Sequence, residues 1–152
     1  MIISLSFRSL IIGVIAPLIL VADLHKTEAR VLTRCEAAIA LQTAGISRTW
    51  ISNWVCLMEN TSRLDTGLVK GPLTQSSYSY GIFQINSREW CARGRKGGVC
   101  NVRCEDLADD NLQDDIRCAQ IIFNSRGFGG WDGWTRSCMN KPLPNVSQCR
   151  RR

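Results

Sequence analysis

Residues Tyr80–Ser87 read YGIFQINS and are the most strand-like stretch of the 152-residue chain. Their β-branched and aromatic side chains predict a strand over residues 80–85. The preceding segment, residues 65–79, is rich in Gly, Ser, Thr and Pro, and the following one, Cys91–Cys104, is dense in Gly and Arg. Both compositions favour loops and turns, so the sequence predicts one small β segment between loops.

Helical patterns flank this β segment on both sides. The first covers Arg34–Ala44 and ends before Gly45, and the second runs from about Thr49 to Arg63. A third covers Asp114–Phe123 and begins with acidic residues, which suits the positive end of the helix dipole. A short fourth helix is predicted over Trp131–Cys138. Helices around a small β segment predict an α+β fold in one domain.

The N-terminus has the pattern of a secretory signal peptide. Arg8 is the only charge in the first 22 residues, and a mostly apolar run from Leu10 to Ala22 follows. That run is too short to span a bilayer, which argues against the alternative of a retained membrane anchor. We therefore predict a signal peptide over residues 1–29, a mature domain over residues 30–152, and a secreted, extracellular protein.

The charge balance and the histidine count exclude several classes of site. The chain carries a formal net charge of +6, and its only histidine, His25, falls in the predicted signal peptide. The mature domain therefore has no Ser–His–Asp triad, no Cys–His dyad and no His-ligated zinc. Its basic character suits an anionic cell surface, while no nucleic-acid motif is present.

Eight cysteines fall in the predicted mature domain. An even number in an exported chain predicts four disulfides, and spacing alone leaves 105 pairings open. Zinc binding is the competing interpretation, but the sequence has no C-x-x-C pair. The eight are Cys35, Cys56, Cys91, Cys100, Cys104, Cys118, Cys138 and Cys149.

Several motifs now resemble the c-type lysozyme and α-lactalbumin family. They are NWVC at Asn53–Cys56, YGIFQINS at Tyr80–Ser87, Trp90-Cys91, Cys118-Ala119 and the W-x-x-W-x-x-x-C pattern of Trp131–Cys138. The similarity covers about Arg30 to Cys149 and includes all eight cysteines. It implies a helical lobe and a small antiparallel β lobe with a cleft between them. It also implies the pairs Cys35–Cys149, Cys56–Cys138, Cys91–Cys104 and Cys100–Cys118.

The family cleaves glycosidic bonds between two carboxyl groups, one an acid with a raised pKa and the other ionised. Counted from Cys56 and from the YGI motif, these two positions hold Thr61 and Ser79 here, so no catalytic carboxylate remains. Glu59 is rotated about 200° from Thr61 on a helix, and Asp65 falls past the predicted helix end. Neither replaces the acid, and the resemblance therefore predicts a lysozyme-like protein without glycosidase activity.

The resemblance also assigns glycan contacts. Asn86, Trp90 and Trp131 match positions that line the family's sugar-binding groove, whereas Trp54 and Trp134 are expected in the core. We expect Trp90 at the surface or in the cleft. The residue before it, often a second aromatic in the family, is Glu89 here, which weakens one subsite.

A calcium loop is a further implication of the resemblance. Asp109, Asp114 and Asp115 would supply side-chain oxygens, and Asp106 and Asn111 backbone carbonyls. Three carboxylates suit the hard oxygen coordination of Ca²⁺. The alternative is an acidic helix N-terminus that interacts with the dipole alone. No other cofactor is expected.

Three functions stay open from sequence. The first is a monomeric, non-catalytic protein that binds an oligosaccharide, peptidoglycan or chitin-like glycan, or an anionic cell-surface partner. The second is an active muramidase in defence or digestion, and the third is an α-lactalbumin-like regulatory subunit. Two glycosylation sequons, at Asn60 and Asn145, and two basic segments, Arg93–Lys96 and Arg150–Arg152, complete the pattern.

Overall fold

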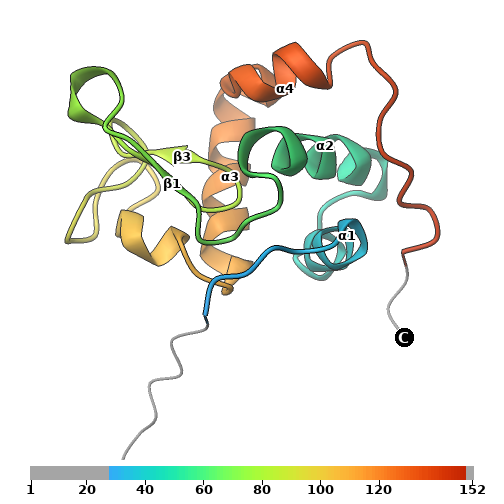
Figure 1. Ribbon diagram of the computed structural model, residues 1–152, viewed down its shortest axis with the longest axis horizontal. Helices are drawn as coiled ribbons and strands as arrows, with labels where there is room; N and C mark the ends of the chain where they lie inside the picture. The colour runs from blue at the N-terminus through green and yellow to red at the C-terminus, as the bar shows by residue number, and fades with distance from the viewer. Residues whose placement is uncertain (1–27, 150–152) are drawn as a thin grey trace, which may run out of the picture.

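The computed structural model describes residues 28–149 (Figure 1). The predicted signal peptide falls outside these residues except for its last two, and the C-terminal arginines fall outside them as well. In the described part, no helix combines the length and the apolar character needed to cross a bilayer. The helices are α1 (Arg34–Thr43), α2 (Ile51–Ser62), α3 (Leu112–Arg126) and α4 (Asp132–Ser137), and the strands are β1 (Val69–Lys70), β2 (Ser79–Tyr80) and β3 (Ile85–Asn86).

The α+β prediction is confirmed, and the helices lie close to their predicted positions. In the view of Figure 1, α1, α2 and α4 lie to one side of α3, and the strands lie to the other. The start of α1 is fixed by a capping box, in which Thr33 and Glu36 exchange side-chain and backbone hydrogen bonds. A 3-10 turn at Arg48–Trp50 precedes α2. That turn leaves Trp50 exposed at the surface.

The predicted continuous strand over residues 80–85 is wrong. The stretch splits into β2 and β3, which pair antiparallel through a tight turn at residues 81–84. Gly81 and Gln84 both have positive φ, +68° and +52°, so the chain reverses there. Glycine adopts this conformation without a steric penalty, and Gly81 is therefore the residue that breaks the strand.

The three strands form one antiparallel sheet in the order β1-β2-β3. Lys70 of β1 lies opposite Ser79 of β2, and Ser79 lies opposite Asn86 of β3. Residues directly opposite each other in antiparallel strands project from the same face. Lys70, Ser79 and Asn86 therefore form one row across the sheet, which we call the polar row.

All four disulfide pairs implied by the family resemblance are confirmed. Cys56–Cys138 joins α2 to the residue after α4, and Cys100–Cys118 joins the long loop to α3. The core between the helices is aromatic: the ring of Trp54 lies 4.9 Å from that of Phe128 and 5.7 Å from that of Phe83. These links hold the middle of α2 against the end of α4 and the aromatic core.

Candidate functional site

Thr61 lies in the last turn of α2, and its hydroxyl is used within the fold. Thr61 Oγ1 donates to the carbonyl of Leu57 at 2.8 Å and lies 3.3 Å from the carbonyl of Ile82. The buried Ser62 makes the matching contacts, with its Oγ 2.9 Å from the Met58 carbonyl and 2.8 Å from that of Ile82. Both hydroxyls therefore link α2 by hydrogen bonds to the turn between β2 and β3.

Ser79 lies in the middle of the polar row and is buried. The side-chain amide of Asn86 donates to Ser79 Oγ and to Ser77 Oγ, each at 3.3 Å. An uncharged hydroxyl held by an amide donor offers a hydrogen bond but no negative charge.

Lys70 connects these two positions. Its Nζ donates to the backbone carbonyl of Thr61 at 2.5 Å, while its strand position lies opposite Ser79. The carbonyls of the last helical turn carry partial negative charge, so an ammonium group is stabilised there. The ammonium group of Lys70 therefore lies at the backbone of one of these two positions, and the Lys70 backbone lies opposite the other.

The acidic residues near Thr61 in sequence are engaged elsewhere. Glu59 forms an ion pair with Arg34 of α1. Asp65 Oδ1 accepts from the backbone N–H of Gly67 at 2.9 Å. These contacts agree with the prediction that neither side chain takes the place of a lost acid.

Sequence analysis missed an acidic residue that is adjacent in the chain to a residue packed on Thr61. Gly133 in α4 packs against Thr61 so closely that a Cβ there would lie 2.8 Å from Thr61 Cγ2. The residue before it is the exposed Asp132, the first residue of α4. Counting from Cys56 and from the YGI motif locates positions before and in the β segment and gives none in α4. The position of Asp132 directly after Trp131 was the sequence signal that could have identified this residue.

The two predicted glycan-binding tryptophans are more covered than expected. Trp131 is 6% exposed, and its Nε1 donates to the carbonyl of Phe83 at 2.9 Å. Trp90 is 7% exposed, so it does not lie at the surface, and of its two expected positions the burial leaves the cleft. The guanidinium of Arg126 lies 4.9 Å from its ring centre, and Arg126 Nη2 donates to both oxygens of Glu89 at 2.7 and 2.8 Å. Glu89 thus holds an arginine over the ring.

The first turn of α3, just after the acidic loop, carries buried carboxylate oxygens that no described residue satisfies. Asp115 is 0% exposed, and neither of its side-chain oxygens has a hydrogen-bond partner, nor has Oδ1 of Asp114. Burial raises the pKa of Asp114 and raises that of Asp115 well above its ordinary value, and the neighbouring acidic charges add to both shifts. Orphaned acidic oxygens of this kind fit a bound cation.

Two other side chains of the predicted calcium loop make contacts of their own. Asp109 Oδ1 accepts from the backbone N–H of Asn111 at 2.7 Å, and the side chain of Asp106, of which only the backbone carbonyl was expected as a ligand, pairs with Arg103. Across residues 28–149, acidic, histidine and cysteine side chains form no group of three or more that could hold a metal ion. The buried oxygens without a partner are those of Asp114 and Asp115, while Asp109 has one oxygen engaged.

Comparison with known proteins now decides the family. The model of the C-type lysozyme/alpha-lactalbumin family matches residues 30–149. The chain belongs to this family. It is 40% identical over 132 residues to lysozyme c-1 of Anopheles gambiae, an alignment that covers 87% of this chain and 94% of that protein.

Solved lysozyme structures agree with the family assignment. The crystal structure of lysozyme from Equus asinus matches with a TM-score of 0.68 at 32% identity, covering 80% of this chain and 99% of the other. A calcium-binding lysozyme from equine milk matches with a TM-score of 0.65 at 32% identity, covering 74% and 92%.

Proposed function

We propose that this chain is a secreted member of the lysozyme family that binds glycans in the family's groove without cleaving them. The observation that carries the proposal is the pair of hydroxyls at Thr61 and Ser79. The Thr61 hydroxyl donates a hydrogen bond to a backbone carbonyl, and the Ser79 hydroxyl accepts one from an amide. The four disulfides support an oxidising, extracellular location.

Glycoside hydrolysis requires a proton for the leaving oxygen and a negative charge for the sugar cation. A threonine hydroxyl does not release a proton at neutral pH, and a serine hydroxyl carries no charge. Lys70 makes hydrolysis still less favourable, because an ammonium group nearby destabilises a cationic transition state. Loss of a general acid alone lowers the rate by about 10²–10⁴.

What the site retains is suited to binding. Asn86 projects from the polar row with an amide that already donates to hydroxyls, as it would to those of a sugar. Trp131 supplies an aromatic wall fixed by its bond to Phe83. Uncharged oligosaccharides, or peptidoglycan strands, are therefore the proposed ligands, and binding requires no cofactor.

Two assays on protein expressed from the full chain test the proposal. With bacterial walls, turbidity should fall at least about 10² times more slowly than with an active c-type lysozyme. With chito-oligosaccharides, tryptophan fluorescence should change and saturate, and Asn86→Ala should weaken binding more than the exposed control Asn124→Ala. Ordinary wall lysis, or a flat titration, would contradict the proposal.

Asp132 is the observation that favours the alternative of an active muramidase. It is an exposed carboxylate in the same helical turn as Gly133, which contacts Thr61. If walls are lysed, Asp132→Asn should abolish lysis, whereas the control Asp110→Asn, at a half-buried aspartate paired with Arg30, should not. Retained lysis in Asp132→Asn would exclude this side chain as the substitute acid.

We also propose a structural calcium ion at the loop before α3. Asp114 and Asp115 would hold it through their unpartnered oxygens, together with Asp109 and the carbonyls of Asp106 and Asn111. The similarity to an equine milk lysozyme described as calcium binding supports this ligand set. Calcium supplies positive charge that offsets buried carboxylates, and a site of this kind also fits an α-lactalbumin-like regulatory role.

The calcium proposal has a direct test. Millimolar calcium added to metal-stripped protein should raise the melting temperature, and magnesium should raise it less, because Mg²⁺ requires a smaller and more regular shell. An unchanged melting temperature would leave only the interaction of acidic residues with the helix dipole.

A further inference from the structure

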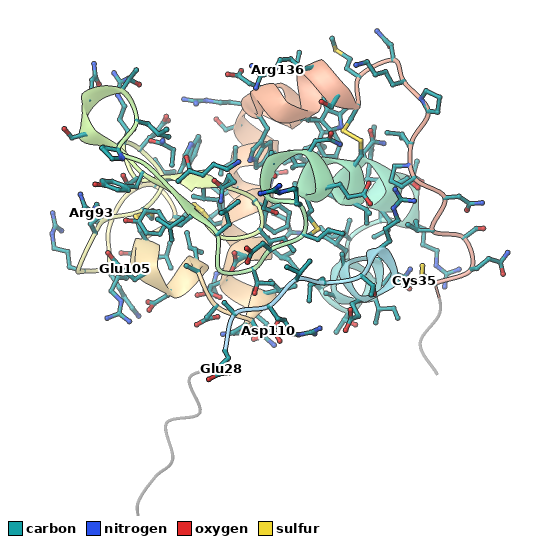
Figure 2. All side chains as sticks on the ribbon, viewed as in Figure 1. Glu28, Cys35, Arg93, Glu105, Asp110 and Arg136 are labelled. Atoms are coloured by element: carbon teal, nitrogen blue, oxygen red, sulfur yellow. A yellow bond between two sulfur atoms is a disulfide. The ribbon has the colours of Figure 1, made fainter. Side chains whose placement is uncertain are left out.

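A hollow of about 420 Å³ opens on the β side of the molecule. Residues from three segments line it: the tip between β1 and β2, the turn after β3, and the long loop that follows. Its cationic lining consists of Arg88, Arg93 and Arg95, and its hydroxyl lining of Ser76, Ser77 and Ser87. We call it the arginine hollow. Figure 2 shows Arg93 at the outer edge of this side of the molecule.

The cations of the arginine hollow have no counter-charge within it. Glu89 is the one carboxylate in its lining, and both of its oxygens already accept from Arg126. Glu105, labelled near Arg93 in Figure 2, accepts from the backbone N–H of Gly94 at 3.0 Å. Arg88 and Arg95 form no ion pair with any residue between 28 and 149.

Part of the lining is held in place. The guanidinium of Arg93 lies over the ring of Tyr78, 4.4 Å from its centre. Ser87 Oγ accepts from the Tyr78 backbone N–H at 3.0 Å, and Ser77 Oγ donates to the Thr74 carbonyl at 2.9 Å. Three guanidinium groups around one concave, partly ordered hollow match the three free oxygens of a sulfate ester better than the two of a carboxylate.

The arginine hollow is continuous with the polar row. Ser77 lines the hollow and also accepts from the amide of Asn86, which donates to Ser79 as well. A polymer bound along the row would therefore extend directly into the hollow. This continuity favours a polysaccharide chain over a flat lipid surface.

We propose that the arginine hollow is a second binding site, separate from the family's groove, that takes the sulfate groups of a sulfated polysaccharide. The experiment is a calorimetric titration of protein expressed from the full chain with a heparin octasaccharide. The test variant carries Arg88→Gln, Arg93→Gln and Arg95→Gln. The control variant carries Arg48→Gln, Arg117→Gln and Arg136→Gln, which removes the same charge from exposed positions outside the hollow.

The test variant should bind the octasaccharide about 10 to 30 times more weakly, and the control less than about threefold more weakly. The double variant Arg88→Gln with Arg95→Gln keeps the Arg93–Tyr78 contact and should show most of the loss. Titration with neutral chito-oligosaccharide should be unchanged in both hollow variants, which separates this site from the groove.

Three results would overturn the proposal. Equal losses in test and control variants would show general attraction to a cationic surface. Equal binding of desulfated heparin would show that carboxylates suffice. Binding of phosphatidylglycerol vesicles that depends on the three arginines and exceeds octasaccharide binding would show that the hollow takes a lipid headgroup.

Discussion

The polar row and the loop before α3 differ in whether they carry negatively charged side chains. Beside the row, hydroxyls occupy the two carboxylate positions, every hydroxyl has a partner, and Lys70 adds a cation. Where the loop ends, in the first turn of α3, carboxylates remain: both oxygens of the buried Asp115 and Oδ1 of the half-buried Asp114 have no partner among residues 28–149. Unsatisfied buried charge is costly unless something compensates it. The contrast therefore separates a region in which the hydroxyls are all paired from one in which acidic oxygens are left unpaired.

The two regions touch at one residue. Gly81 follows β2 directly, and a Cβ on it would lie 1.7 Å from the Leu107 carbonyl and 2.7 Å from Asp115 Oδ1. The chain beside Ser79 thus packs on the carboxylate of the acidic loop without an intervening side chain.

Restoring charge beside the polar row should produce the largest effect. Thr61→Glu with Ser79→Asp should raise wall lysis by about 10² or more over the wild type, because it supplies both an acid and a counter-charge. Adding Lys70→Ala should raise it further. Lys70 should lower the pKa of a carboxyl introduced at position 61. As the pH is raised, the double variant should therefore lose activity at a lower pH than the triple variant. Absence of lysis in both would show that the groove no longer binds its substrate.

Adding a side-chain atom at the contact between the two regions should have the next largest effect. Gly81→Ala should lower the free energy of unfolding by about 2–4 kcal/mol, because it combines a left-handed φ with a clash against backbone. Urea unfolding measures this loss. Gly129→Ala, which meets nothing within 4 Å, is the control and should be close to neutral. A neutral Gly81→Ala would show that the two regions are not in close contact.

Removing one carboxylate from the loop should abolish the response to calcium. At a calcium concentration 100 times the Kd, the wild type should gain about 2.7 kcal/mol of unfolding free energy. Asp115→Asn should lose this gain, while Asp110→Asn, whose wild-type carboxylate pairs with Arg30, should keep it. An equal response in both variants would place any calcium elsewhere.

The pH dependence should be the smallest effect, on the order of 1 kcal/mol per pH unit. The pKa of Asp115 is raised in the folded state, so metal-free protein should lose stability as pH rises from the ordinary Asp pKa through the folded-state pKa. Glu36 acts in the opposite sense, because hydrogen bonds from Thr33 and the charge of Arg30 lower its pKa to about 2, so its contribution is lost as pH falls from about 4.5. Thermal melting in chelator from pH 4 to 8 tests this, and a stability that rises throughout this range would contradict it.

Much of the fold followed from the sequence because its signals are local or fixed by covalent bonds. The helices around Trp54 and the acidic start of α3 depend on periodicity and on neighbouring charges, and Thr61 and Ser79 could be located by counting from a cysteine and a motif. The turn at Gly81 was also visible in sequence, but the β-forming side chains around it suggested a strand.

The remaining features depend on residues brought together by the fold. Lys70 reaches Thr61 because β1 pairs with β2, and its sequence neighbours are loop residues. Trp90 is covered because Glu89 holds Arg126, 37 positions away. Asp132 comes into consideration only because its neighbour Gly133 packs against Thr61. No spacing rule in one sequence reports such contacts.

The two long disulfides have a consequence for a chain that meets proteases. Cys35–Cys149 spans 114 positions, and Cys56–Cys138 lies wholly inside that span. A backbone cut in the exposed tip at residues 71–76 would leave both fragments joined by two covalent bridges. Such a nicked molecule would gain only one water, stay a single covalent species and separate into two fragments only after reduction.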